Sequence, residues 1–98
     1  MIGGYGREPG QFAFPQNLAV EDASSVLYVA DLANRRVQAI SAQGQFVASY
    51  APPDVEDWQV LGLAVGPDGE VFAGDALNNA VWVFSTRDGS ATRIEVRP

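Results

Sequence analysis

Short apolar stretches recur along the chain between clusters of Gly, Pro, Asp and Asn, and most of them alternate apolar with polar residues. Alternation with a period of two predicts half-buried β-strands, and the intervening clusters predict turns. We expect strands at residues 2–5, 18–20, 26–30, 36–40, 45–50, 61–65, 70–73, 80–85 and 91–96. Residues 51–58 carry two prolines and three acidic residues, and we expect no regular element there. The pattern therefore predicts an all-β protein.

These stretches form two copies of one pattern. Residues 18–20 match 63–65 at an offset of 45, residues 27–37 match 71–81 at an offset of 44, and Gly44 matches Gly89 at an offset of 45. A period of this length, with several short strands in each copy, is typical of β-propeller blades. Two blades cannot close a ring, so we expect the chain to need partners.

The residues that repeat resemble the NHL repeat. The first copy contains Gly10-Gln11-Phe12, Pro15, Leu27-Tyr28-Val29-Ala30-Asp31, Asn34-Arg35-Arg36-Val37-Gln38 and Gly44-Gln45-Phe46. It has Asn17 where the family usually has Gly. The second copy keeps the apolar positions with Asp75 and Asn78, but it lacks the Gly-Gln-Phe motif and the Arg. The resemblance covers nearly the whole chain and implies four-stranded antiparallel blades, typically six to a ring, with the innermost strand first.

The resemblance also implies a division of the chain. Residues 1–6 would end a preceding blade as its outermost strand, residues 7–50 would form the first repeat, and residues 51–98 would form a second, degenerate repeat. Each blade has two apolar faces that neighbours must cover, and two blades bury only one shared interface. We therefore expect either self-association or further blades. Three copies of the chain would supply six blades.

Composition narrows the choice of function. The chain has 98 residues, 47% of them hydrophobic and 18% charged, which suits one packed domain. Its formal net charge of −6 and its isoelectric point near 4.2 disfavour a nucleic acid as the main partner. RNA binding, known for some NHL propellers, needs a basic loop face, and Arg7 and Arg35 are the obvious candidates. The first residues do not read as a signal peptide, and no stretch approaches the roughly 20 apolar residues of a membrane span, which leaves the localisation open.

The residue types present argue against catalysis within this chain. It has neither Cys nor His, which removes thiolate chemistry, the usual general base and the commonest zinc ligand. Asp31 with Asn34, and Asp75 with Asn78, could supply oxygen ligands to calcium, but Asp and Asn at strand ends more often hold turns together. We predict that these four residues are structural. We expect no catalytic residue, metal or cofactor here, although a metal-dependent hydrolase or lyase fragment with its catalytic residues outside the chain is an alternative.

The propeller template places several polar and aromatic residues on one loop face. The candidates for partner binding are Gln11, Arg35, Trp58, Gln59 and Asn79. Trp and Arg bury much area with few torsions, which favours them at interfaces. Trp58 could instead plug the junction between blades, as Phe14 would one repeat earlier. The leading expectation is a non-catalytic propeller unit whose loop face binds a protein or peptide, or else a carbohydrate; a purely structural segment is a further alternative.

Overall fold

The computed structural model describes residues 6–11, 15–21, 24–31 and 33–95. Within these ranges every regular element is a β-strand. The strands are β1 (Pro15–Glu21), β2 (Val26–Asp31), β3 (Arg36–Ile40), β4 (Phe46–Tyr50), β5 (Val60–Val65), β6 (Glu70–Asp75), β7 (Ala80–Ser85) and β8 (Ala91–Glu95). The strand predicted at residues 2–5 lies outside the described residues.

The strands form two separate antiparallel sheets of four, in the orders β1-β2-β3-β4 and β5-β6-β7-β8. Each strand pairs with the next one in the sequence, so each sheet is a simple meander. The predicted all-β fold with two four-stranded antiparallel sheets is confirmed. Residues 51–59 contain no strand, as expected. No helix long and apolar enough to cross a membrane occurs in the described part of the chain.

The two sheets share a local irregularity at matching positions. The pairing of β1 with β2 shifts between Pro15 and Asn17, and the pairing of β5 with β6 shifts between Val60 and Gly62. Each shift is a β-bulge, which adds one unpaired residue and bends the strand. The bulge lets β1 begin at Pro15, three residues before the start predicted from alternation. Proline suits this place because the first residue of a strand can lack an N–H donor.

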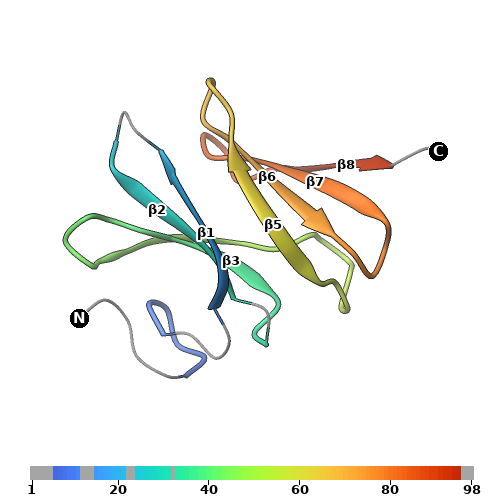
Figure 1. Ribbon diagram of the computed structural model, residues 1–98, viewed down its shortest axis with the longest axis horizontal. Helices are drawn as coiled ribbons and strands as arrows, with labels where there is room; N and C mark the ends of the chain where they lie inside the picture. The colour runs from blue at the N-terminus through green and yellow to red at the C-terminus, as the bar shows by residue number, and fades with distance from the viewer. Residues whose placement is uncertain (1–5, 12–14, 22–23, 32, 96–98) are drawn as a thin grey trace.

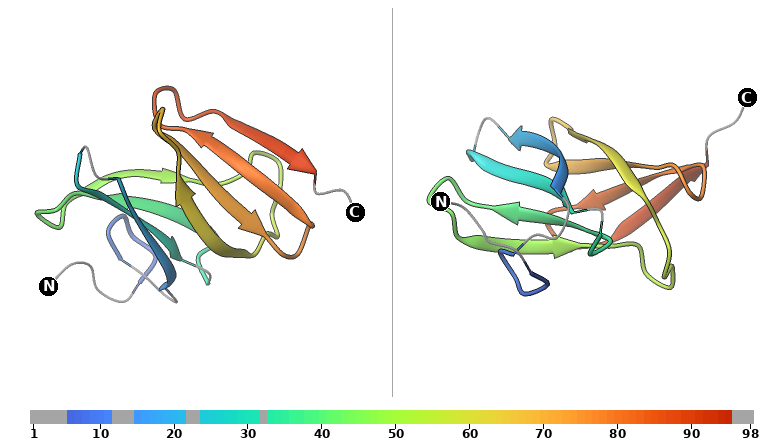
Figure 2. Two further views of the ribbon diagram at one scale, coloured as in Figure 1. Left: turned by 45° about the horizontal axis from the view of Figure 1, so that its top comes forward. Right: turned by 60° about the horizontal axis from the view of Figure 1, so that its bottom comes forward.

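The sheets meet along their first strands. β1 and β5 lie side by side, and the remaining strands of each sheet follow outward (Figures 1 and 2). One face of each sheet packs against the other, and the Tyr50 and Phe84 rings join them with centroids 5.7 Å apart. The core comprises Tyr28, Ala30, Val37, Ala39 and Tyr50 from the first sheet, and Val60, Val71, Ala73, Trp82 and Phe84 from the second, with Trp58 from the linker.

Turn chemistry explains where the hairpins reverse. Gly69 and Gly89 follow Asp68 and Asp88 and have φ of +80° and +75°, a region that only glycine adopts without strain. A Cβ on Gly69 would also stand 3.0 Å from the hydroxyl oxygen of Thr86. Both glycines therefore allow tight turns, which join β5 to β6 and β7 to β8 as antiparallel hairpins.

Candidate functional site

In each sheet, hydrogen bonds join the turn after the second strand (β2 or β6) to the chain segment that precedes the first strand. The side-chain amide of Asn34 donates to the carbonyl of Gly6 and to the carboxylate of Asp31, both at 2.8 Å. Asn78 donates in the same way to the carbonyl of Asp57 at 3.0 Å and to the carboxylate of Asp75 at 2.7 Å. Each Asn therefore holds its own turn against the leading segment. We call the surface formed by these turns and segments the loop face.

Asp75 is the hub of this network in the second sheet. Its Oδ1 accepts hydrogen bonds from the backbone amides of Gln59, Leu77 and Asn78, and its Oδ2 accepts from the side chains of Asn78 and Trp82. Burial by itself raises the pKa of the Asp75 carboxyl, but these hydrogen bonds outweigh it and leave the pKa below its ordinary value. The carboxylate thus accepts hydrogen bonds from three loop residues and from Trp82.

In the first sheet a different set of side chains holds the leading segment. Asp31 is fully buried, and its Oδ2 lies 3.6 Å from the guanidinium Nε of Arg36. The other guanidinium nitrogens of Arg36 donate to the carbonyls of Arg7, Glu8 and Gln11. Arg36 therefore fastens the leading segment across the end of the sheet. The second sheet has Ala80 at the matching position, so it lacks this attachment.

Gln38 and Trp82 occupy matching positions in the two sheets but serve different neighbours. Gln38 is fully buried; its Oε1 accepts the amide of Gly10 at 2.8 Å and its Nε2 donates to the carbonyl of Gln11 at 2.7 Å. Trp82 donates to Asp75 instead. Sequence reasoning missed the structural part played by Arg36 and Gln38. The signal available was that the two positions differ between otherwise similar repeats.

Three of the predicted binding residues come together in one hollow. It has a volume of about 280 Å³ and is lined by Ala33, Arg35, Asp57, Trp58, Gln59 and Leu77. Arg35 forms an ion pair with Asp57 at 3.2 Å, and both side chains are more than half exposed. Gln59 and Leu77 are exposed as well, and Leu77 adds an apolar surface of 60% exposure. The hollow therefore combines exposed charged, amide and aliphatic groups.

The indole of Trp58 forms the floor of this region rather than a projecting anchor. Trp58 is only 3% exposed, and its Nε1 donates to the carbonyl of Arg35 at 2.7 Å. Its ring meets the ring of Phe84 edge-on, with centroids 6.0 Å apart. Trp58 thus ties the turn of the first sheet to the core of the second. This placement fits the alternative in which Trp58 plugs the junction between blades; Phe14 lies outside the described residues.

The remaining two candidates lie apart from that hollow. Asn79 lines a neighbouring depression of about 280 Å³ beside Leu61, Gly74 and Val81. Gln11 belongs to the leading segment, where its Oε1 accepts the amide of Glu8 at 3.2 Å. Arg35 and Asn79 end matching turns with φ of +52° and +50°. Non-glycine residues seldom adopt this region, and Asn tolerates it best. Both residues therefore shape the turns in addition to any contact with a partner.

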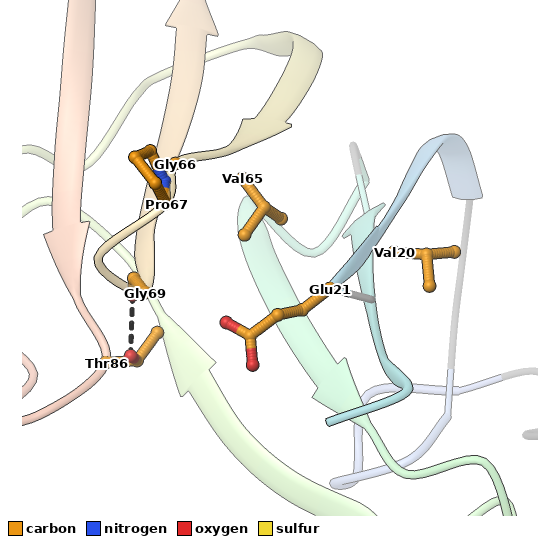
Figure 3. Close-up of a pocket in the computed structure, with 7 residues that line it drawn as sticks. All are labelled: Val20, Glu21, Val65, Gly66, Pro67, Gly69 and Thr86. Atoms are coloured by element: carbon orange, nitrogen blue, oxygen red, sulfur yellow. Dashed lines mark hydrogen bonds between the residues drawn. The ribbon is translucent and has the colours of Figure 1, made fainter. Parts of the chain in front are cut away.

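A larger pocket lies between the sheets at the other end of β1 (Figure 3). It measures about 640 Å³ and is lined by Val20, Glu21, Val65, Gly66, Pro67, Gly69 and Thr86. Thr86 donates to the carbonyl of Gly69 at 2.6 Å, and Glu21 extends its carboxylate into the gap between the two sheets (Figure 3). Glu21 is the one ionisable group among these lining residues. Among the described residues no group of three or more Asp, Glu, His or Cys side chains could hold a metal ion.

Comparison with solved structures defines the class of fold. No family model matches the chain, and no curated protein matches it. The fold is similar to that of virginiamycin B lyase from Staphylococcus aureus (TM-score 0.74, 19% identity) over 87% of this chain and 28% of the lyase. It is also similar to a streptogramin B lyase (TM-score 0.76, 14% identity), over 93% of this chain and 28% of that protein. Hydrazine synthase from Kuenenia stuttgartiensis (TM-score 0.74, 20% identity) matches over 95% of this chain and 27% of its own.

These neighbours are β-propeller proteins, and the two sheets described above are two β-propeller blades. The chain spans little more than a quarter of each neighbour. At identities of 14% to 20%, the likeness shows the fold alone. The resemblance to NHL repeats rests on the sequence motifs and remains a prediction.

Proposed function

We propose that the chain is part of an NHL-type propeller whose loop face binds a protein or peptide partner without catalysis. The observation that carries this proposal is the hollow at which Arg35, Gln59 and Leu77 converge above the buried Trp58. Exposed charged and amide groups around an aliphatic side chain can meet both the backbone and the side chains of a peptide. The Arg35–Asp57 pair is exposed, so a partner can replace it at little cost.

Rigidity of the loops supports the proposal. Asp75 holds Gln59 and the turn that contains Leu77, and Trp58 holds the turn that contains Arg35. Loops that are already ordered lose little conformational entropy when a partner binds, which favours affinity. Both oxygens of the Asp75 carboxylate accept hydrogen bonds from the loops and from Trp82, which suits a supporting role better than a catalytic one.

A binding experiment with a matched control tests the proposal. The probe is a library of random linear peptides displayed on phage, selected against the whole chain. Arg35→Asn removes the charge while keeping a residue that tolerates positive φ, as Asn79 does in the matching turn. The control, Arg87→Asn, removes the same charge from the turn between β7 and β8. We expect Arg35→Asn to weaken the selected peptides about tenfold, equivalent to about 1.4 kcal/mol. Equal binding to both variants, or no selectable peptide, would reject this proposal.

A second proposal is favoured by the two lyases among the structural neighbours: the chain is a portion of a propeller enzyme whose catalytic residues lie outside it. Binding of virginiamycin B to the chain, measured by calorimetry, compares the two proposals, because a chain without the catalytic residues can hold this substrate but cannot convert it. Binding of the antibiotic that Arg35→Asn leaves unchanged would favour the enzyme portion. No binding of the antibiotic, together with peptide binding at Arg35, would favour the first proposal.

A further inference from the structure

Each sheet has a second apolar face that points away from the other sheet. Register and alternation place Leu18, Val20, Leu27, Val29, Ile40 and Phe46 together on the first outer face. They place Ala64, Phe72, Val81, Val83 and Ile94 together on the second outer face. Leu18, Val20 and Ile94 are 57%, 49% and 49% exposed. The same register places Gln38 on the first outer face, with Asp31 and Arg36 at its end, and places Glu70 at the end of the second. Gln38 and Ile40 are fully buried within the chain, so only part of the first outer face is exposed.

The repeat shows what kind of surface these faces match. Shifted by 44 or 45 residues, the first outer face becomes Leu63, Val65, Val71, Ala73, Phe84 and Ala91. All six belong to the internal core between the sheets or pack against it. The first outer face is therefore the counterpart of the surface that the second sheet turns toward the first.

The residues of the second outer face likewise have counterparts in the first copy of the repeat. Shifted back by 44 or 45 residues, it becomes Ala19, Tyr28, Val37, Ala39 and Tyr50. These residues form the surface that the first sheet turns toward the second. The chain thus contains one complete blade interface and, on its outside, one half of a second interface at each end. Apolar character persists at the matched positions named above, whereas the position of Trp82 is occupied by Gln38 on the first outer face.

We propose that two copies of the chain associate head to tail, with the second outer face of one copy packed on the first outer face of the next. A second copy is the natural occupant of the second outer face. Its first outer face carries the counterparts of the residues that pack on the first sheet inside the chain, and it is partly exposed. The exposed Ile94 of one copy would meet the exposed side chains of Leu18, Val20 and Phe46 in the next copy. Ile40, the counterpart of Phe84, is already fully buried within its own chain. The two faces of such an interface differ, so the association either closes into a ring or continues.

The NHL resemblance favours a closed ring of three copies. Three chains of two blades supply the six blades that the NHL resemblance implies. The net charge of −6 on each copy opposes association at long range, and salt screens that repulsion. We therefore expect assembly to increase with both protein concentration and ionic strength. This surface is separate from the hollow at Arg35, so the proposal does not depend on peptide binding.

Light scattering across a concentration series in high salt measures the mass of the assembly. The wild-type chain is expected to approach three chain masses. Val20→Asp places a charge on the first outer face, and Ile94→Asp places one on the second; both side chains are already exposed in a single copy, so the fold should survive. Each variant alone should have the mass of one chain. Leu77→Asp, an equally exposed apolar position in the turn after β6, should keep the wild-type mass.

Mixing the two variants distinguishes head-to-tail packing from other modes. A Val20→Asp chain keeps its second outer face and an Ile94→Asp chain keeps its first, so an equal mixture should form two-chain particles and nothing larger. A wild-type chain that stays monomeric at all concentrations would overturn the proposal and assign both faces to blades of a longer polypeptide. Variants that retain the wild-type mass, or a mixture without two-chain particles, would also overturn it. Circular dichroism confirms folding, and Leu18→Asp replaces Val20→Asp if that variant unfolds.

Discussion

Replacing Asp75 by Asn tests whether a single buried carboxylate holds the loop face together. The amide can keep one oxygen toward the three backbone donors of residues 59, 77 and 78. Its nitrogen then replaces Oδ2 and faces the side-chain N–H groups of Asn78 and Trp82. Two hydrogen bonds to a charged acceptor are lost, and the indole N–H of Trp82 is left buried without an acceptor.

The size of the stability loss expected for Asp75→Asn follows from these hydrogen bonds. A hydrogen bond to a charged group contributes about 1.5–3 kcal/mol, and an unsatisfied buried donor costs about 1–3 kcal/mol. Because such terms overlap, we expect Asp75→Asn to lower the free energy of unfolding by about 3 kcal/mol. The free energy of unfolding of the whole chain should be roughly 5–15 kcal/mol, so the loss is a large share of its stability. Asp68→Asn makes the same chemical change at an exposed turn and should cost less than about 0.5 kcal/mol.

Urea-induced unfolding followed by circular dichroism measures both variants. Trp82→Phe removes the N–H group that Asp75→Asn leaves without an acceptor, so the double variant should be about 1–2 kcal/mol more stable than the sum of the single losses predicts. Strictly additive losses, or an Asp75→Asn chain with the wild-type free energy of unfolding, would refute the assignment of Asp75 as the hub.

The pH dependence of the same two proteins gives an independent check. The pKa of Asp75 lies below its ordinary value in the folded chain. The ionised carboxylate therefore stabilises the fold above the unfolded-state pKa, and this contribution is lost as the pH falls through the folded-state pKa. We expect the wild-type chain to lose more stability on acidification than Asp75→Asn does. Parallel pH profiles for the two proteins would contradict the lowered pKa.

Three further predictions concern the junction, a turn and the tyrosines. Trp58→Ala should cost about 3–5 kcal/mol, because it removes a buried ring that packs on Phe84; urea unfolding measures the loss. Asn79→Gly should change the free energy of unfolding by less than about 0.5 kcal/mol, whereas Asn79→Val should cost about 1–3 kcal/mol, because φ is +50° there. Burial, with a further contribution from Glu21, raises the pKa of Tyr28 to about 12. The stability that the neutral phenol contributes is therefore present below its unfolded-state pKa near 10 and lost as the pH rises toward 12, as absorbance titration of the phenolate can follow.

Controls separate these effects from general loss of structure. Trp58→Phe keeps an aromatic ring but loses the hydrogen bond to the Arg35 carbonyl and part of the buried ring, so it should cost about 1–2 kcal/mol, less than the Ala variant. Equal losses for the Phe and Ala variants would contradict the packing role of the indole. Equal stability of the Gly and Val variants at position 79 would contradict the positive φ. A Tyr28→Phe chain should lose less stability between pH 10 and 12 than the wild-type chain does, and an identical profile would contradict the raised pKa.

The strands and their grouping could be predicted because the necessary information is local and repeated. Alternation over five or six residues predicts a strand, and Asp-Gly predicts a hairpin turn; both depend on neighbours a few residues away. The repeat at an offset of 44 or 45 residues then shows that the two halves form the same unit. The prediction that Asp75 and Asn78 hold a turn together is likewise local, because the two residues are three positions apart and share a hydrogen bond.

The start of β1 and the work of Arg36 and Gln38 could not be predicted in this way. Pro15 joins the sheet because a bulge brings it opposite Asp31, and that pairing spans 16 residues. Arg36 and Gln38 bind backbone groups 25 to 29 residues earlier in the chain. No local pattern marks such partners. Their positions become visible only when the leading segment is seen lying across the end of the sheet.

Trp58 shows most clearly what the sequence determines and what only the tertiary structure decides. The sequence determined that an aromatic residue stands just before β5, and it left open whether the ring binds a partner or fills the junction. The tertiary structure placed the ring under the hollow, where its N–H donates to the carbonyl of Arg35 and the ring meets Phe84 in an edge-on arrangement. The physical reason is that strand formation depends on short-range periodicity, whereas burial depends on which distant surfaces meet. The repeat in the sequence determined two blades, and their packing decided which faces are covered and which remain exposed.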